Sequence, residues 1–314
     1  MATTQTPPGT DLPLVVPDPK KLVRNRKREA RMRLWREFRR NKMGMAGLFI
    51  LIFFFAIAIF APLIVSRCYI SAICPANGKA LQPPTANYPF WFGTDKLGRP
   101  VLALTVYGAQ VSLLVGLIGT FMTMVLGTLV GLVAGFRGGW TEKILMSVTD
   151  WILVIPFLPL AIVLATLLGP SFVTIIIVIA ITSWPSTARI IRAEVLSLKT
   201  RGFVERSRAL GAKGSSIVTK HILPNVAPLV FANAILIVAV VILSESTLAF
   251  LGVGDPQRAS WGKLLEDAFG GGATYAGNWW WIIPPGLCIV LVVLSFTMIG
   301  YALDDVLNPK LRSR

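Results

Sequence analysis

Long apolar runs without charged side chains alternate with shorter polar segments along this sequence. A helix needs roughly 17–25 mostly apolar residues to cross a bilayer, and six stretches approach or meet that requirement. They cover residues 45–65, 111–136, 144–168, 171–188, 226–251 and 282–303. Because a backbone in hydrocarbon must satisfy its own hydrogen bonds, such runs form helices. The pattern predicts an all-α, polytopic membrane protein with six transmembrane helices.

The segments between these runs give the rest of the domain organisation. A polar tail at 1–44 precedes the first span, and a short tail at 304–314 follows the last. Longer connections are expected at 66–110, 189–225 and 252–281. The 252–281 connection ends in three consecutive tryptophans, which are typical of the interface between membrane and water.

Composition agrees with the membrane class. Hydrophobic residues make up 54% and charged residues 15% of the 314 residues, and the mean hydropathy is +0.67. A soluble chain carries about a quarter charged residues. The formal net charge of +16 raises the alternative of a nucleic-acid partner, and the positions of the basic residues decide against it.

The basic residues divide unequally between the two sets of connections. If the N-terminus is cytoplasmic, 25 of the 31 lysines and arginines fall on the cytoplasmic side. The outer loops then hold only Arg67, Lys79, Lys96, Arg99, Arg258 and Lys263. This is the bias of a positive-inside membrane protein. It predicts cytoplasmic ends for both termini and no nucleic-acid partner.

The N-terminal tail contains a strongly basic segment at 20–44. Met32, Trp35 and Phe38 are spaced by three, which places them on one face of a helix. Such a helix can lie along the inner leaflet, or the segment is only a solvated, positively charged flank. Residues 1–19 lack the features of a cleavable signal peptide, so the first span is expected to serve as an uncleaved anchor.

Two acidic residues fall within the apolar runs. Ionisable residues are expensive in a membrane and are presumed functional. Asp150 is expected near the inner interface or paired with a neighbouring helix, and Glu245 lies toward the outer end of the fifth span. Both are candidate gate or pathway residues, and helix packing remains the alternative for Glu245. Pro156 and Pro159 favour a bent third span.

Cysteine and histidine usage gives little sign of catalytic or metal chemistry. Cys68 and Cys74 lie six positions apart in the first outer loop. A disulfide suits an oxidising compartment, but the spacing does not establish the required geometry. The single histidine, His221, makes a histidine-based metal site unexpected. No phosphate-binding GxxxxGK[ST] loop is present, so we expect neither a cofactor in this chain nor an enzyme.

The cytoplasmic connection holds the most distinctive pattern, FVERSRALGAKGSSIVTKHILPN, at residues 203–225. Phe203 and Leu210 are seven apart and are expected to share a helical face, and Gly211 stands where a helix ending prefers glycine. A second short helix should stop before Pro224, which would form a rigid turn into the fifth span. We expect His221 to pack beneath the first short helix or to cap a helix end.

This loop resembles the EAA loop of permease subunits in binding-protein-dependent ABC importers. Glu205 is followed by Gly211 six residues later and by HILP ten residues after that glycine. Further blocks, in order, are similar to the C-type permease subunit of dipeptide and oligopeptide importers. They are FGTDKLGRP, DWILVIPFLPLAI, GPS, WPSTARIIRAEVLSL, LAFLGVG, SWGKLLEDA and NPKLR. Arg206 and Ser207 depart from the family, which usually has an alanine pair there.

The resemblance implies a type I ABC importer permease fold with a core at 111–314. It implies a bacterial inner-membrane location, a homologous second permease subunit, two cytoplasmic ATPases that bind ATP and magnesium, and an extracytoplasmic substrate-binding protein that delivers peptides. The 203–225 loop would couple the ATPases to the pathway. The expected coupling residues are Phe203, Val204, Glu205, Arg208, Ala209, Leu210, Gly211, His221 and Pro224.

Two alternatives stay open at this point. The first is an importer of the same class whose cargo is nickel, glutathione or haem instead of peptide. Outside the class, a channel or secondary transporter would work without ATPases, but Asp150 and Glu245 are few groups on which to build ion coupling.

Overall fold

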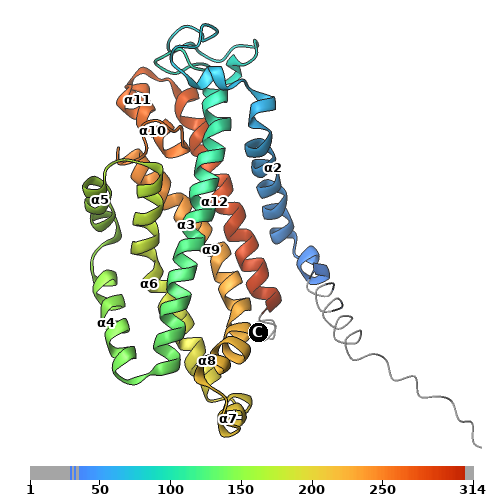
Figure 1. The fold of residues 1–314 in the computed structure, drawn as a ribbon. Coiled ribbons are helices and arrows are strands. Elements are labelled where there is room, and N and C mark those ends of the chain that lie inside the picture. Colours follow the sequence, from blue (N-terminus) through green and yellow to red (C-terminus); the bar gives the residue numbers. More distant parts are fainter. Residues whose placement is uncertain (1–28, 30–31, 33–34, 308–314) are drawn as a thin grey trace, which may run out of the picture.

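The chain folds into an elongated bundle of helices, which the computed structural model describes for residues 29, 32 and 35–307 (Figure 1). Five long helices form the body, and within the described residues no strand occurs. They are α2 (Lys42–Ile64), α3 (Val101–Arg137), α6 (Phe172–Lys199), α9 (Leu223–Phe250) and α12 (Trp279–Leu307). Outside the described residues lie 1–19, most of the basic segment before residue 35 and the tail beyond residue 307.

Shorter helices lie around this body. Two of them, α4 (Gly139–Val154) and α5 (Phe157–Leu168), flank α6 at one side. At one end lie α7 (Gly202–Ala209), α8 (Gly214–Ile217) and η3 (Val218–Ile222). At the opposite end lie η1 (Arg67–Ile70), η2 (Phe90–Phe92), α10 (Trp261–Gly270) and α11 (Ala273–Ala276). The all-α fold class expected from the sequence is confirmed for the described residues.

Helices α3 and α6 pack closely because α3 presents glycines to its neighbour. A Cβ atom added at Gly127 would lie 2.6 Å from Cβ of Thr187, and one at Gly135 would lie 2.8 Å from Cβ of Val195. Small residues allow helix backbones in a membrane to approach in this way. The contact between α3 and α6 is the most extensive one between helices of the bundle.

The predicted third span at 144–168 is not one helix. It is broken into α4 and α5, which meet at an angle of 94°. Ile155 ends α4 in an extended conformation and Pro156 precedes α5, because a residue before proline is disfavoured in the helical region. The bend expected from the prolines is present, but it is a break instead of a curve.

Among the described residues, five helices are long and apolar enough to cross a membrane, or six if α4 and α5 count as one span. The amide of Phe172, at the start of α6, donates to Asp255 Oδ2 at 3.1 Å in the connection after α9. The α5–α6 junction therefore lies near the same end of the molecule as that connection. This placement favours counting the α4–α5 pair as one broken crossing.

Three other predicted boundaries move outward in the structure. Helix α6 continues to Lys199 and does not end near residue 188, so the predicted cytoplasmic connection at 189–225 contains its last turns. Helix α3 begins at Val101 and not near residue 111, so the predicted outer loop at 66–110 contains its first turns. Helix α12 begins at Trp279 and includes the three tryptophans assigned to a loop. All three helices extend past the strictly apolar run, because polar and aromatic residues are compatible with helix beyond the hydrocarbon.

Just before the first span begins, Phe38 packs against α12. Its ring is buried with Ile299, Ala302 and Val306, whereas Met32 and Trp35 remain exposed. The three residues therefore do not act as one apolar face in this structure, since Phe38 faces the protein.

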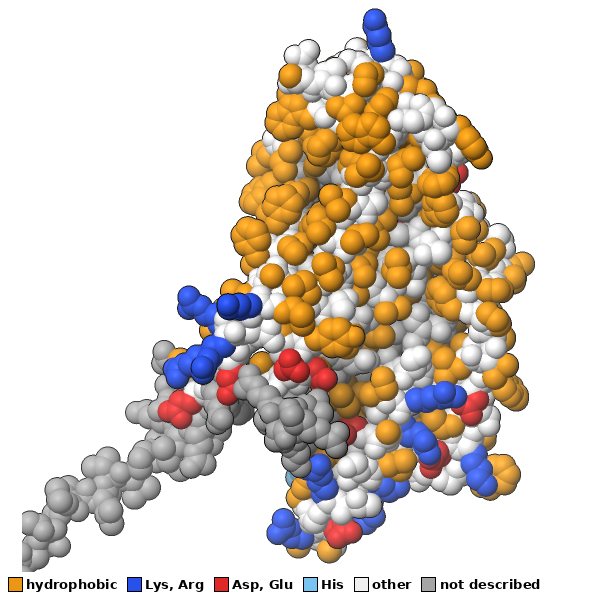
Figure 2. Space-filling view, turned by 180° about the vertical axis from the view of Figure 1, so that it is seen from behind, with side chains coloured by type: hydrophobic (Ala, Val, Ile, Leu, Met, Phe, Trp, Pro, Cys, Tyr) orange, Lys and Arg blue, Asp and Glu red, His pale blue; other side chains and the backbone are white. Residues whose placement is uncertain are grey.

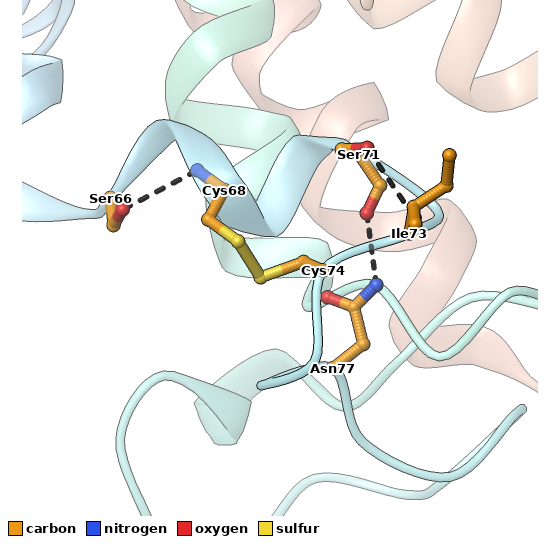
Figure 3. The surroundings of a disulfide bond; sticks show 6 residues. All are labelled: Ser66, Cys68, Ser71, Ile73, Cys74 and Asn77. Atoms are coloured by element: carbon orange, nitrogen blue, oxygen red, sulfur yellow. Dashed lines mark hydrogen bonds between the residues drawn. A yellow bond between two sulfur atoms is a disulfide. The ribbon is translucent and has the colours of Figure 1, made fainter.

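The first outer loop is closed by a disulfide. Cys68 and Cys74 are bonded, with their Cα atoms 5.4 Å apart. Their spacing in the sequence did not decide whether they form a disulfide. Around the bond, Ser66 Oγ accepts from the amide of Cys68, and the Asn77 side chain donates to the carbonyl of Ser71 (Figure 3). The loop presents Ile73, which is 90% exposed.

Candidate coupling site

Helix α7 projects from one end of the bundle and ends in a Schellman motif (Figure 1). Gly211 has φ +77°, its amide donates to the carbonyl of Arg208 at 3.0 Å, and the amide of Ala212 donates to the carbonyl of Ser207 at 3.1 Å. This is the hydrogen-bond pattern of that helix ending, which requires a left-handed residue after the cap. The helix end expected at Gly211 is confirmed.

One face of α7 packs against the bundle. Val204 is fully buried in a cluster with Ile191, Val195 and Ile217, and Phe203 packs at its edge. The His221 ring is tilted against the Phe203 ring at 6.3 Å between centroids, and its Nε2 lies 3.4 Å from Ser207 Oγ. His221 therefore lies beneath α7, as expected from the sequence.

The opposite face of α7 points away from the bundle. Glu205, Arg208, Ala209 and Leu210 are all exposed, and Leu210 reaches 87%. The predicted shared face of Phe203 and Leu210 is wrong, because Leu210 is the cap residue beyond the last helical turn. The free surface of α7 is polar and basic apart from Ala209 and Leu210.

Basic side chains gather at the α7 end of the molecule. Figure 2 shows lysines and arginines clustered there, below a wide band of hydrophobic side chains. Arg206, one of the departures from the family pattern, is exposed on α7, and its Nε donates to the carbonyl of Gly202 at 3.2 Å. Ser207 is used within the helix, since its Oγ also donates to the carbonyl of Phe203 at 2.9 Å.

The segment after α7 runs into α9 without a turn. Residues from Gly214 to Phe250 form one continuous helix of 37 residues, so the predicted rigid turn at Pro224 is wrong. Pro224 follows the π-helical turn η3, in which the amide of Leu223 bonds to the carbonyl of Val218. The wider turn accommodates the missing proline donor and the ring's clash with the preceding turn. The side chain of Asn225 donates from Nδ2 to the carbonyl of His221 at 2.6 Å.

Ion pairs hold α4 to α6 near the same end. Asp150 Oδ1 lies 2.5 Å from Arg189 NH2, and Arg192 Nε donates to Glu142 Oε1 at 2.7 Å. Asp150 is about half exposed. The helix pairing that the sequence offered for Asp150 is thus present, and the structure places it outside the core.

Glu245 lies in a different part of the molecule, at the outer part of α9. It is buried, and its Oε2 accepts from Ser112 Oγ of α3 at 3.2 Å and from Ser246 Oγ at 3.4 Å. Ser112 Oγ also accepts from the amide of Trp261 at 3.2 Å, at the start of α10. Glu245 therefore links α9, α3 and α10 through hydroxyl groups, and it lies near the opposite end of α9 from the coupling loop.

Sequence reasoning missed the charged network of the outer end. Asp95 is fully buried; its Oδ1 accepts from the amides of Leu97 and Arg99, and its Oδ2 accepts from Arg99 Nε at 2.7 Å. Arg99 also approaches Asp267 of α10 at 3.8 Å. A local signal existed in the motif TDKLGR, since an aspartate before a glycine turn favours such bonds.

Lys263 extends this network on α10. Its Nζ contacts Glu266 and lies 3.1 Å from Asp267 Oδ1. Burial alone would lower the pKa of the Lys263 ammonium, but the hydrogen bonds and negative charges of Glu266 and Asp267 outweigh that effect and raise the pKa. The network fastens α10 to the first outer loop.

No group of three metal-ligating side chains occurs in the part of the chain that the structure describes. The site around α7 consists of a buried apolar base, a capped short helix and a continuous helix leading into the bundle. Such an arrangement can transmit a displacement.

Comparison with known proteins identifies a family. Residues 127–313 match the family described as binding-protein-dependent transport system inner membrane component. Residues 32–84 match the N-terminal transmembrane domain of oligopeptide transport permease C. The first of these matches covers more than half of the chain, including α7 and the helix that follows it.

Individual relatives agree with that family. The chain is 38% identical over 279 residues to the dipeptide transport system permease protein DppC of Bacillus subtilis (strain 168), covering 88% of this chain and 85% of that protein. It is 37% identical to the oligopeptide permease OppC of the same organism, over 89% of this chain and 90% of that protein. It is 34% identical to the glutathione permease GsiD of Escherichia coli O6:K15:H31, over 96% and 95%.

A solved structure supports the fold. A chain of the MetNI methionine ABC transporter, in an inward-facing conformation, superimposes with a TM-score of 0.52 and 22% identity, covering 67% of this chain and 97% of that chain. At that identity the likeness concerns the fold.

Proposed function

Because this chain belongs to the binding-protein-dependent transport system inner membrane components, the permeases of ABC importers, we propose that it forms half of a translocation pathway for di- and oligopeptides. It is a multi-pass protein of the bacterial inner membrane. The observation that carries the proposal is the exposed helix α7, seated on a buried base and joined to a continuous 37-residue helix.

The partners follow from the family. The other half of the pathway is a homologous permease subunit, and two cytoplasmic ATPases, which hold ATP and magnesium, dock on α7. A substrate-binding protein delivers cargo at the opposite face. The α7 end is then cytoplasmic, as are both termini, and the basic side chains clustered there support this orientation.

The coupling step is mechanical. ATP binding draws the ATPases together and displaces Glu205, Arg208, Ala209 and Leu210 with them. Because Val204 is buried against Ile217 in one cluster, the displacement passes into the helix at 214–250 as a rigid movement. Helix movements between two packed arrangements then open the pathway alternately. Asp150 and Glu245 are candidates for residues that stabilise one arrangement.

A crosslinking experiment tests the coupling. Ala209→Cys should crosslink to a cysteine placed on the co-expressed ATPase, while Tyr275→Cys, at the opposite end and 97% exposed, should not. Replacement of 203–211 by a Gly/Ser linker should abolish ATP-dependent uptake. If ATP-dependent uptake survives that replacement, or if Ala209→Cys crosslinks no better than Tyr275→Cys, α7 does not couple the two proteins.

Cargo is tested separately. Similarity to the dipeptide and oligopeptide permeases favours a peptide cargo. Similarity to the glutathione permease favours the alternative cargo, glutathione. The purified complex, with its binding protein, should show ATPase stimulation by dipeptides and oligopeptides. Stimulation by glutathione, nickel or haem alone would replace the peptide assignment and leave the coupling proposal intact.

A further inference from the structure

We propose that a groove between α2 and α12 binds one acyl chain of an outer-leaflet phospholipid. The groove has a volume of about 600 Å³, within the range of roughly 300–1,000 Å³ of small-molecule pockets. Its side walls come from the outer halves of α2 and α12, its back wall from the start of α3, and its roof from the first outer loop. It lies away from α7.

The groove is open on the membrane side and closed on the protein side. Along the rim, Phe53, Ile283 and Leu287 are each about half exposed. At the floor, Phe54 and Ala109 are buried. Since these residues belong to membrane-spanning helices, the open side faces the interior of the membrane and not water.

Three of the four tryptophans in its wall already use their N–H groups. Trp261 Nε1 donates to the carbonyl of Thr105 at 3.0 Å, Trp280 Nε1 to that of Thr94 at 3.4 Å, and Trp91 Nε1 to that of Ala86 at 3.3 Å. These tryptophans all line the groove. With their N–H groups used, they offer apolar ring surface, which suits a hydrocarbon, and the Thr105 hydroxyl is the one buried side-chain polar group of the lining that is left without a partner.

The length of the groove fits one leaflet. Its lining on α12 runs from Trp279 to Leu291, and this distance is about 18 Å at a rise of about 1.5 Å per residue. Half of the hydrocarbon core is about 15 Å thick. The tryptophans stand at the outer end, where aromatic side chains mark the headgroup region. A chain anchored there would extend to the middle of the bilayer.

The size of the groove bears on whether a lipid chain or a helix of another subunit lies in it. Its volume of about 600 Å³ extends over about 18 Å along α12. A helix with side chains is about 10 Å across and would seat only one face in an open groove of this size. A single acyl chain can lie within the groove along its whole length.

Photolabelling tests this assignment. The full chain, purified with the subunits that accompany it, is placed in vesicles of phosphatidylethanolamine and phosphatidylglycerol that contain phosphatidylglycerol with a diazirine on one acyl chain. The labelled sites of the protein should concentrate on α2 around residue 54 and on α12 between 283 and 291. They should exceed severalfold the labelling of Phe231, an exposed residue of α9.

Two matched variants locate the chain. Leu287→Trp fills the groove and should remove the excess labelling, while Leu294→Trp, on the same face of α12 seven residues further and outside the lining, should retain it. Both positions are about half exposed, so both variants should fold, and Ile283→Trp serves if Leu287→Trp does not.

Three results would each overturn the proposal. They are labelling no greater than at Phe231, crosslinks from the groove to another subunit in place of lipid, and loss of the label on addition of peptide substrate.

Discussion

At Gly211 a single backbone angle ends α7. Its φ is +77°, a conformation that costs a residue with a Cβ roughly 1–2 kcal/mol, and nothing lies within 4 Å of a Cβ placed there. Gly211→Ala should therefore destabilise the end of α7 by about that amount through the backbone alone, without a steric clash. Hydrogen exchange of the amides at 204–212 measures the change.

Gly202 provides the control. It also has free space around an added Cβ, but it lies in the first turn of α7 with an ordinary helical backbone. Gly202→Ala should leave exchange unchanged or slow it, because alanine favours helix over glycine. Equal effects of the two substitutions would show that the Schellman ending does not determine the stability of α7.

A second residue-scale prediction concerns Asp95. It is buried with its charge paired to Arg99 and its other oxygen bonded to two amides. Asp95→Ala should destabilise the protein by about 3–5 kcal/mol, since it breaks the buried pair with Arg99 and leaves the amides of Leu97 and Arg99 without their acceptor, and Asp95→Asn should cost less. The midpoint of thermal unfolding in detergent measures this. The exposed neighbour substitution Lys96→Ala should have little effect, and a similar loss there would refute the role of Asp95.

Residues differ in how far the sequence predicts them. Gly211 was predictable because its signal is local: a helix followed by glycine. The partners of Glu245 were not, since Ser112 and the amide of Trp261 come from other helices and meet only after packing. Phe203 and Leu210 show the intermediate case. Their spacing was read as one helical face, but the helix ends at Ala209, so the spacing no longer applies at Leu210.

At the scale of elements, apolar runs predicted the existence of the long helices and missed their junctions. Prolines illustrate why. Pro156 separates α4 from α5 at 94°, whereas Pro224 lies within a continuous helix because η3 widens the preceding turn. The same residue type breaks one helix and not the other, and only the surrounding packing distinguishes them. Ile217, just before η3, and Ile222, its last residue, are both buried and fix its phase.

That packing makes η3 testable. Deleting Thr219, which is exposed, would replace the wide turn of η3 by an ordinary helical turn, and Ile217 and Ile222 would keep nearly the same face. The ring of Pro224 would then clash with the preceding turn, so thermal stability should fall. Adding Pro224→Ala to the deletion should restore most of that loss, because alanine suits an ordinary helical turn. If Pro224→Ala leaves the loss unchanged, η3 does not serve to accommodate the proline.

At the scale of the whole molecule, the number of crossings depends on α4 and α5. Together they connect the α7 end, where α3 passes into α4, to the outer end, where Phe172 contacts Asp255 and the Arg258 guanidinium lies 4.4 Å from the Phe172 ring centroid. Trp140 and Leu168 are the exposed residues near the two ends of the pair. A broken crossing places them on opposite sides of the membrane, and a re-entrant loop places them on one side.

Labelling with a membrane-impermeant thiol reagent separates these arrangements. In a Cys288→Ala background, where Cys68 and Cys74 are bonded, Leu168→Cys should react from outside intact cells, and Trp140→Cys should react only after the cells are opened. Ile73→Cys in the disulfide loop serves as the outer reference. Ser216→Cys in α8 serves as the inner reference. Reaction of Trp140→Cys and Leu168→Cys from the same side would leave five crossings and place the two termini on opposite sides of the membrane, contrary to the orientation that the basic residues favour.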